Sequence, residues 1–448
     1  MNLDYLYDKF HENLNKEAII WNNQSYTYKW LLTQVNAWKQ QFSNAANIAG
    51  KVVGLKVDFS PVSVALLIAL IENKCIIVPL TQSIKDKFEE FCAIAEIELM
   101  IEVNEDDIVD ICQLELVSKH ELIAHLKQIS HPGLILFSSG STGKSKAALH
   151  DFAPLLQKFE IARHSKRIIT FLLFDHIGGI NTLFYTRYNG GCIIAISNRS
   201  SKSVCEAIQN FGAQILPTSP TFLNLLLING DYKNYNLKHL ETITYGTEAM
   251  SKNTLARLHD AFPHTKLQQT YGLSEIGIMR SKSESSDSLY MKIGGEGYDL
   301  RVADGLLEIK AKSAMLGYLN AASPFTEDGW FKTGDMVELK GEYIKILGRQ
   351  SEIINVGGMK VYPTEIENII QQMDGVGDVV VSGEYNLITG YIVKAKINLF
   401  TDETLSDFRL RMKEFCRERL DAYKIPQKIV ITNEFLYSSR FKKMRKEN

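Results

Sequence analysis

Apolar and polar positions along the chain alternate between the period of a helix and the period of a strand. Residues 51–57 form a short apolar run that predicts a strand, residues 61–73 predict a helix, and residues 75–80 predict the next strand. A strand, a helix and a strand at this spacing favour a parallel sheet covered by helices. Further buried strands are predicted over 168–174 and 242–248. The pattern indicates an α/β fold.

The C-terminal part of the chain has a different pattern. Strand-like runs over 378–382 and 387–395 precede an amphipathic stretch over 405–420 and a last strand over 428–432. This mixture predicts a small α+β domain. A chain of 448 residues is too long for one compact core, so two or three domains are expected.

Composition and charge exclude several classes of protein. Hydrophobic residues make up 45% and charged residues 23% of the chain, as in a soluble globular protein, and the formal net charge is −2. This balance gives no global attraction to nucleic acid or to an anionic membrane. The first residues lack a signal-peptide core, and the apolar run 62–71 is too short to span a bilayer. We therefore expect neither a nucleic-acid partner nor stable membrane anchoring.

The six cysteines are scattered, and none forms a CxxC pair or a cluster with metal-ligand spacing. Single cysteines of this kind are typical of buried thiols in a reducing compartment. The expected location is the cytoplasm.

The first candidate site is a phosphate-binding loop. A buried strand predicted over 134–137 runs into a segment rich in glycine, hydroxyl and lysine residues. Glycine allows close approach of the backbone, N–H and hydroxyl groups donate hydrogen bonds, and lysine supplies charge. The candidate phosphate-binding residues are Ser138, Ser139, Gly140, Ser141, Thr142, Gly143 and Lys146.

One alternative for this loop is a Walker loop, GxxxxGK followed by Ser or Thr. Gly143, Lys144 and Ser145 fit its end, but its first glycine falls on Ser138. A P-loop kinase or NTPase would release ADP and would need a Walker-type aspartate as well.

Three further stretches carry candidate chemistry. Residues 269–275 end in Tyr271, Gly272, Leu273, Ser274 and Glu275. They combine an aromatic ring, a glycine that allows close approach of the backbone, a hydroxyl and a carboxylate. The string DGWFKTGD at 328–335 ends in an aspartate that can accept two hydrogen bonds, and Arg349 follows with a planar fork of donors.

Together these stretches resemble, in the same order, the motifs of the adenylate-forming (AMP-binding) superfamily. That superfamily includes acyl- and aryl-CoA synthetases, peptide-synthetase adenylation domains and luciferases. The chain departs from the family pattern at Ser145, Ala147 and Ser274, where proline, glycine and threonine are usual. The resemblance implies a large N-terminal domain of parallel and mixed sheets with helices over 1–348. A small mobile C-terminal domain over 349–448 would follow, with a hinge near Ser351.

The resemblance also implies roles for the candidate residues. The loop would hold the β- and γ-phosphates of ATP, Ser274 would reach the α-phosphate, and Glu275 would bind Mg²⁺. Tyr271 and Gly272 would face the adenine, as would the glycine turn formed by Gly246 and Thr247. Asp335 and Arg349 would hold the ribose.

Two of the implied assignments stay open. If His176 occupies the place of the family's histidine, the substrate is a fatty or aryl acid; if Phe174 and Asp175 match the Phe-Asp pair of amino-acid-activating enzymes, Asp175 would bind an α-amine. The family's catalytic lysine lies in a GK motif near the C-terminus, which this chain lacks. Lys442 and Lys443 are the candidates, and Lys442 is preferred because Arg445 follows it by three residues.

The function implied is that of an acid–thiol ligase. The enzyme would use ATP and Mg²⁺ to convert a carboxylic acid into an acyl-adenylate with release of pyrophosphate. It would then pass the acyl group to the thiol of CoA or of a carrier-protein phosphopantetheine, so that an acyl carrier protein is a candidate partner. The alternatives are an amino-acid-adenylating enzyme, a P-loop kinase or NTPase, and a nucleotide-binding relative without catalysis.

Overall fold

Two seven-stranded sheets form the larger part of this computed structural model, which describes residues 3–44, 48–139, 145–438 and 440–445. In the first sheet the strands follow the order β13-β12-β11-β9-β10-β1-β2 and run parallel except for β2. Its strands are β1 (Glu17–Trp21), β2 (Gln24–Thr27), β9 (Arg167–Ile169), β10 (Cys192–Ala195), β11 (Ile215–Thr218), β12 (Thr242–Tyr245) and β13 (Lys266–Gln269).

The second sheet has the order β20-β8-β7-β4-β3-β5-β6, with parallel central pairs and antiparallel edges. Its strands are β3 (Val52–Lys56), β4 (Ile76–Leu80), β5 (Leu99–Val103), β6 (Val109–Gln113), β7 (Gly133–Ser139), β8 (Ser145–Asp151) and β20 (Gly317–Tyr318). The parallel pairing of β3 with β4 confirms the strand–helix–strand prediction for this region.

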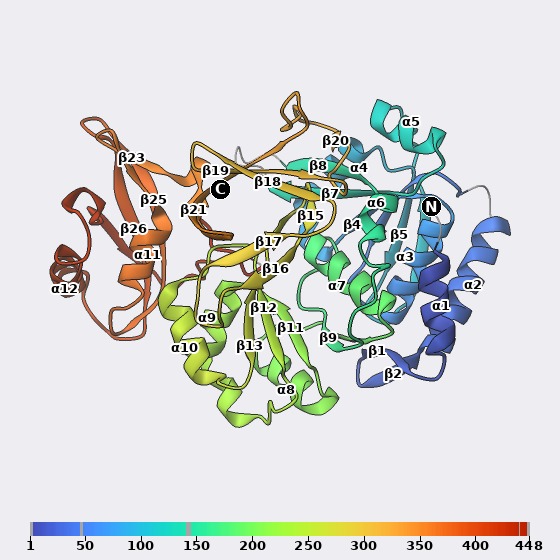
Figure 1. Ribbon diagram of the computed structural model, residues 1–448, viewed down its shortest axis with the longest axis horizontal. Coiled ribbons are helices and arrows are strands. Elements are labelled where there is room, and N and C mark those ends of the chain that lie inside the picture. Colours follow the sequence, from blue (N-terminus) through green and yellow to red (C-terminus); the bar gives the residue numbers. More distant parts are fainter. Residues whose placement is uncertain (1–2, 45–47, 140–144, 439, 446–448) are drawn as a thin grey trace.

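Helices cover and separate the two sheets (Figure 1). They are α1 (Asp4–Glu12), α2 (Tyr28–Asn44), α3 (Pro61–Glu72), α4 (Phe88–Ala95), α5 (Glu121–Gln128), α6 (Phe152–Gln157), α7 (Ile177–Tyr188), α8 (Ser201–Phe211), α9 (Pro220–Asn229) and α10 (Lys252–Ala261). The largest core cluster joins Leu66 of α3 and Leu183 of α7 to Ile19 and Val53 of the two sheets. The apolar run 62–71 is therefore a core helix, which Ser60 caps and Pro61 begins.

A six-stranded antiparallel sheet and a short hairpin complete the N-terminal domain. They consist of β14 (Gly272–Leu273), β15 (Gly277–Ile278), β16 (Arg280–Ser283), β17 (Met291–Gly294), β18 (Tyr298–Ala303), β19 (Leu306–Ala311), β21 (Phe331–Lys340) and β22 (Tyr343–Arg349).

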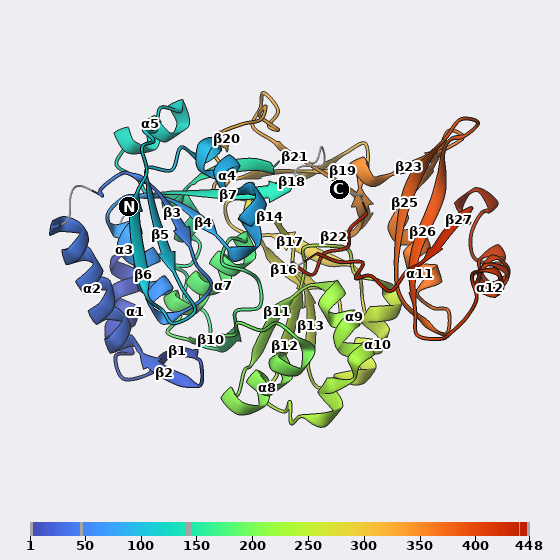
Figure 2. The same cartoon turned by 180° about the vertical axis from the view of Figure 1, so that it is seen from behind.

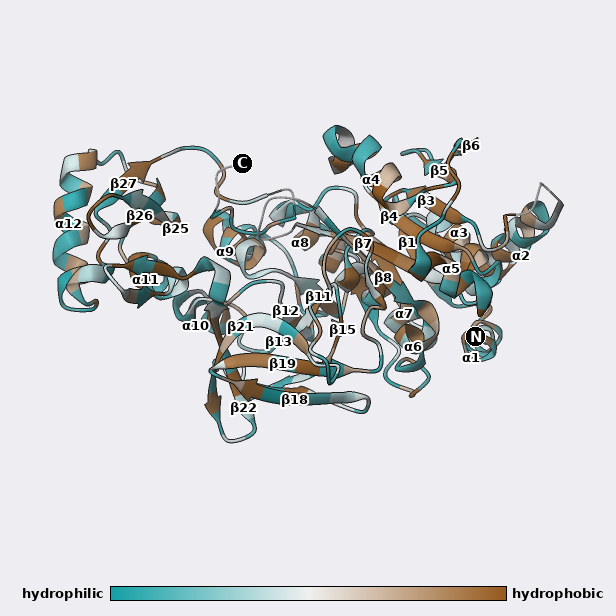
Figure 3. Cartoon of the chain, turned by 90° about the horizontal axis from the view of Figure 1, so that it is seen from above, coloured by the Kyte–Doolittle hydropathy of each residue, from teal (hydrophilic) through white to brown (hydrophobic). Residues whose placement is uncertain are grey.

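A separate C-terminal domain lies at one end of the long axis of the molecule (Figure 1). It contains β23 (Ile354–Val356), β24 (Met359–Val361), α11 (Pro363–Ile370), β25 (Val376–Asn386), β26 (Gly390–Leu399), α12 (Leu405–Arg417) and β27 (Lys428–Ile431), with its own buried core. After β27 the chain returns to the N-terminal domain (Figure 2). Strands β4, β7 and β19 consist mainly of hydrophobic residues, whereas helix α12 consists largely of hydrophilic ones (Figure 3). This architecture confirms the predicted α/β class with an additional α+β domain.

Three local predictions were wrong. The strand predicted over 168–174 ends at Ile169, because the carbonyl of Phe171 accepts a hydrogen bond from the Arg199 side chain (2.8 Å) instead of from a neighbouring strand. The run beginning at Leu387 is a turn, since Asn386 Oδ1 accepts from the backbone N–H of Ile388 (2.9 Å) and β26 begins only at Gly390. Cys112 is exposed on β6, while the other five cysteines are buried and all six are free. Among the described residues, no helix combines the length and the apolar character that crossing a membrane requires.

Candidate active site

A long cleft of about 2280 Å³ runs between the N-terminal sheets and along the C-terminal domain. This volume exceeds that of an ordinary small-molecule pocket, so the cleft joins several subsites. Among the predicted site residues, the cleft is lined by Ser138, Lys146, His176, Gly246, Thr247, Gly272, Ser274, Glu275, Arg349, Lys442 and Lys443. Tyr271 and Asp335 lie behind this lining. Ser139 ends β7, and Gly140, Ser141, Thr142 and Gly143 lie outside the described residues.

The candidate phosphate loop connects two antiparallel strands. Strands β7 and β8 form a hairpin in which Ser138 is opposite Lys146 and Ser139 is opposite Ser145. A Walker loop leads instead from a strand into a helix. The hairpin therefore argues against a P-loop kinase or NTPase. Lys146 lies at the cleft, with its Nζ 5.2 Å from the ring centroid of Tyr318.

Ser274 and Glu275 lie in the turn between β14 and β15, and Ser274 does not cap a helix. Nε2 of His150 contacts the Ser274 carbonyl oxygen at 2.5 Å, and burial lowers the pKa of His150, so that a neutral imidazole donates this bond. Oε1 of Glu275 accepts a hydrogen bond from the Tyr318 hydroxyl (2.7 Å). These contacts fix the turn so that the carboxylate of Glu275 faces the cleft.

No group of three or more His, Cys, Asp or Glu residues in the described parts of the chain is arranged to bind a metal ion. Glu275 therefore offers a carboxylate to the cleft outside any such group. This arrangement fits Mg²⁺, which commonly keeps several waters and takes one or two protein carboxylates together with substrate phosphates.

Asp335 is buried behind the cleft wall and has partners on both carboxylate oxygens. The Tyr271 hydroxyl donates to its Oδ2 (2.5 Å), and Nε of Arg349 lies 3.2 Å from its Oδ1. The ring of Tyr271 packs with Met279, Ile309 and other residues of the adjoining core cluster. Burial raises the pKa of Asp335, and the Arg349 guanidinium opposes this shift.

His176 combines a structural and a cleft-facing position. Its Nδ1 accepts a hydrogen bond from the Gly178 backbone N–H (3.0 Å) at the start of α7, so that its other ring nitrogen is left for the cleft. Burial lowers the pKa of His176 well below 6.5, and the positive charges of Lys442 and Arg440 act in the same direction. The imidazole is therefore neutral at pH 7.

Asp175 is already paired with a cation of this chain through one of its two carboxylate oxygens. Its Oδ2 lies 2.6 Å from Nη2 of Arg440 and accepts a hydrogen bond from Thr81 Oγ1 (3.1 Å). A cation of this chain thus already occupies the place that the amino-acid-activating alternative would give to the substrate's ammonium group.

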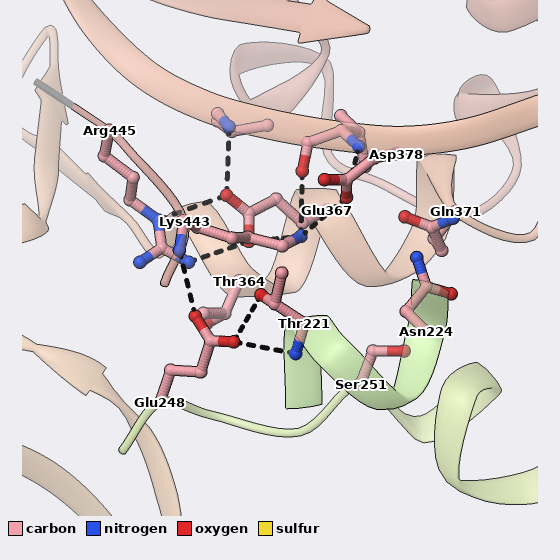
Figure 4. Close-up of polar contacts among 12 residues, drawn as sticks. Thr221, Asn224, Glu248, Ser251, Thr364, Glu367, Gln371, Asp378, Lys443 and Arg445 are labelled. Atoms are coloured by element: carbon pink, nitrogen blue, oxygen red, sulfur yellow. Dashed lines mark hydrogen bonds and ion pairs between the residues drawn. The ribbon is translucent and has the colours of Figure 1, made fainter. Parts of the chain in front are cut away.

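The two candidate tail lysines have different surroundings. Lys442 lies at the cleft, and its ammonium has no hydrogen-bond or ion-pair partner among the described residues; burial lowers its pKa to about 8. Nζ of Lys443 donates to the Val379 carbonyl (2.8 Å) and lies 3.6 Å from Glu367 and 3.5 Å from Asp378 (Figure 4). Lys443 thus binds the C-terminal domain, and of these two lysines only Lys442 presents to the cleft an ammonium without a partner among the described residues.

Sequence reasoning missed the residues that hold this tail. The Arg445 guanidinium contacts both oxygens of Glu367 (2.8 and 3.1 Å), and its Nη1 lies 3.1 Å from Glu352. On the other side, Glu248 accepts hydrogen bonds from the backbone N–H groups of Thr221 (2.8 Å) and Lys443 (3.2 Å) (Figure 4). The only sequence signal was the position of Glu367 on the apolar face of α11, between Ile366 and Ile370.

Comparison with known families places this geometry in context. The family described as "AMP-binding enzyme" matches residues 7–306, and its C-terminal domain, "AMP-binding enzyme C-terminal domain", matches residues 365–442. The chain is 26% identical over 344 residues to an indoleacetate–CoA ligase of Aromatoleum aromaticum, and the match covers 71% of the chain and 66% of that ligase. A match to a second ligase, from Rhodococcus jostii, covers 60% of that protein's length. The chain thus spans less than two thirds of the length of these two relatives.

A further relative is a 2-succinylbenzoate–CoA ligase of Enterococcus faecalis, with 24% identity over 75% of this chain and 73% of the relative. Among solved structures, the anthranilate CoA ligase AuaEII in complex with anthranoyl-AMP superposes with a TM-score of 0.82, at 18% identity over 98% of this chain and 95% of that chain. The o-succinylbenzoate CoA synthetase of Bacillus subtilis superposes with a TM-score of 0.74, at 19% identity over 98% and 96% of the two chains. At these identities the structures show a shared fold.

Proposed function

Because this chain belongs to the AMP-binding enzyme family, we propose that it activates a carboxylic acid with ATP and transfers the acyl group to a thiol. The observation that carries the proposal is the position of Lys442. Its unpaired ammonium lies at the cleft with His176, Ser274 and Glu275, so that three distant parts of the chain meet there.

In the first step a carboxylate oxygen of the acid attacks the α-phosphorus of ATP. The bond from that phosphorus to the bridging oxygen breaks, and pyrophosphate leaves with the electron pair. The Lys442 ammonium binds the attacking carboxylate and the α-phosphate and so offsets the negative charge that accumulates between them. Ser274 donates its hydroxyl hydrogen to the α-phosphate.

The remaining candidate residues position ATP. Ser138, Ser139, Gly140, Ser141, Thr142, Gly143 and Lys146 hold the β- and γ-phosphates. Asp335 and Arg349 bind the ribose, with Tyr271 fixing the carboxylate of Asp335 from behind. Gly246, Thr247 and Gly272 form the wall beside the adenine. Glu275 would hold a Mg²⁺ ion, which would neutralise phosphate charge.

In the second step the sulfur of the thiol attacks the acyl carbon, the bond from carbon to the AMP oxygen breaks, and the thiol proton passes to solvent. The tail must leave the cleft to admit the thiol. We place the domain boundary at 348/349 and the hinge at Ser351, within the short 3₁₀ helix Gln350–Glu352 that joins β22 to the C-terminal domain. Gly357 and Gly358, both with positive φ, would form a wall of the thiol entrance.

The substrates are a small carboxylic acid of the fatty or aryl class and CoA, with a carrier-protein phosphopantetheine as the other acceptor of the same chemistry. Asp175 supports this acid class because Arg440 already occupies its carboxylate. The free cysteines support a cytoplasmic location.

The test is ATP–pyrophosphate exchange with a panel of fatty, aryl and amino acids. Exchange that depends on a fatty or aryl acid is expected, and Lys442→Ala should lower it by about 100-fold or more, as for the loss of a group that stabilises charge in the transition state. Lys413→Ala is the matched control, because Lys413 is exposed on α12. Exchange that is equally fast in both variants would refute the role of Lys442. An absence of exchange with every acid would refute the proposed function.

A further inference from the structure

Lys158 is another lysine at the cleft that has no acidic partner among the described residues. It follows α6 directly, and its Nζ donates to Oδ1 of Asn181 (2.7 Å) and to the carbonyl oxygen of Ile278 (2.8 Å). Both acceptors are neutral, so one of the three N–H donors is left without an acceptor among the described residues. A charged group that is removed from water is normally paired with an opposite charge.

A second cation lies near the Lys158 ammonium. Burial lowers the pKa of Lys158 to about 7, and the nearby Arg280 of β16 acts in the same direction. No carboxylate of the described residues contributes to this shift. The local field at this end of the cleft therefore favours an anion, and an anion bound there would restore the full charge of the ammonium.

Strands β12 and β13 give the cleft one polar wall, whereas Phe159 and Ile278 adjoin Lys158 itself. Side chains alternate along strands, and in β12 and β13 one set, including Ile243 and Leu267, packs into the core. The other set faces the cleft and includes Thr244 and Gln268. A tunnel for a plain alkyl chain would instead be lined mainly by apolar side chains.

Helix α7 sets the spacing between His176 and the residue that holds Lys158. His176 lies at its start, and Asn181, which holds the Lys158 ammonium, lies five residues later. At 1.5 Å per residue this is a separation of about 7.5 Å along the helix axis. Gly178 lines the cleft between these two points, and Asn181 lines it at the second.

We propose that Lys158 selects the acid substrate by pairing with a second anionic group at the end remote from the activated carboxylate, so that the substrate is a dicarboxylic acid with an aliphatic or aryl spacer. This inference rests on the proposed function for the identity of the reacting end. It narrows the acid class from fatty or aryl acids in general to acids that carry a second carboxylate.

The test compares matched acids with and without the second carboxylate. Octanoate is paired with octanedioate, and phenylpropanoate with its para-carboxylated analogue. The kcat/KM for acid-dependent pyrophosphate exchange should be higher for the diacid of each pair. Lys158→Met should lower this value for diacids by roughly 10- to 100-fold, the loss typical of one charge-assisted hydrogen bond, and should change it for mono-acids by less than about threefold.

Lys158→Arg keeps the charge and should retain the diacid preference, while Lys413→Met is the surface control. A preference for mono-acids in the wild type, or equal losses for both acids in Lys158→Met, would overturn the inference and leave the proposed function standing.

Calorimetric binding of the same acids without ATP separates the two hypotheses. Tighter binding of the diacid that Lys158→Met abolishes, combined with no exchange for any acid, would support the anion site and refute the proposed function. Equal binding of diacid and mono-acid, combined with no exchange, would overturn both.

Discussion

Glu367 holds the C-terminal tail to the C-terminal domain, and its replacement by glutamine tests whether this contact positions Lys442. The carboxylate is buried, pairs with Arg445 and Lys443, and accepts a hydrogen bond from the Val381 backbone N–H (2.9 Å). Glutamine has nearly the same shape but no charge. Glu367→Gln therefore removes the ion pairs and leaves the packing of α11 in place.

The pKa of Glu367 gives the magnitude of this effect. The cations of Arg445 and Lys443 lower it from 4.5 to about 2 in spite of the burial, which on its own would raise it. At 1.36 kcal/mol per pKa unit, the folded structure favours the charged form by about 3 kcal/mol. A depressed carboxyl pKa stabilises the fold fully above pH 4.5, and this contribution is lost as the pH falls toward 2. The whole effect is thus present at pH 7.

Measuring the two half-reactions separately shows which of them loses activity in Glu367→Gln. If the ion pairs keep Lys442 in the cleft, Glu367→Gln should lower pyrophosphate exchange by between about 10- and 100-fold, the larger value being close to the full 3 kcal/mol. Thioester formation from a supplied acyl-adenylate should change little, because the tail must leave the cleft for that step. Glu365→Gln is the matched control on the same helix, since Glu365 pairs with Lys424 near the surface (2.8 Å). Equal losses in both half-reactions, or a loss no larger than that of Glu365→Gln, would refute the positioning role.

Three further predictions concern the nucleotide and acid sites. Asp335→Asn should raise the KM for ATP by roughly 10- to 100-fold, because a charge-assisted acceptor is lost; an unchanged KM in steady-state kinetics would contradict ribose binding. Gly246→Ala should lower kcat/KM for both substrates, since a Cβ would lie 2.8 Å from the Thr270 carbonyl oxygen, and activity equal to the wild type would show that the turn can shift. The diacid-to-mono-acid ratio of kcat/KM should fall as the pH rises above about 7, because the pKa of Lys158 is about 7 and the ammonium then loses its proton. The pKa of Lys442 is higher, about 8, and Lys442 acts on both acids, so its loss of a proton leaves the ratio unchanged.

The sequence predicted the elements whose information is local. The apolar run that became α3 and the strand before the phosphate loop depend on neighbouring residues and were placed correctly. The end of β9 was predicted wrongly, because the side chain of Arg199, 28 positions away, donates a hydrogen bond to the Phe171 carbonyl. Residues 168–174 alone carry no trace of that contact.

The candidate site was predicted in its motifs and missed in its long-range ion pairs. Arg440 and Asp175 are 265 positions apart, and Arg445 and Glu367 are 78 positions apart, so no local pattern reveals either pair. Lys158 was missed for the same reason, because a lysine after a helix is ordinarily solvated. Its importance follows only from the neutral partners that the fold brings around it.

The tail that carries Lys442 and Lys443 turns just before them, with the Phe441 N–H donating to the Ser438 carbonyl (2.9 Å) and Lys443 bridging back to Tyr437. Both lysines line the cleft, but the Lys443 ammonium is bound to the C-terminal domain, whereas the Lys442 ammonium has no such partner among the described residues and faces the cleft. The lysine that faces it is determined by the flanking cations: Arg440 binds Asp175 of the N-terminal domain, while Lys443 and Arg445 bind Glu367 of the C-terminal domain. The tail thus connects the two domains on either side of Lys442. Since the Lys442 ammonium is in place only when both sets of ion pairs are formed, competence for adenylation depends on the docking of the C-terminal domain.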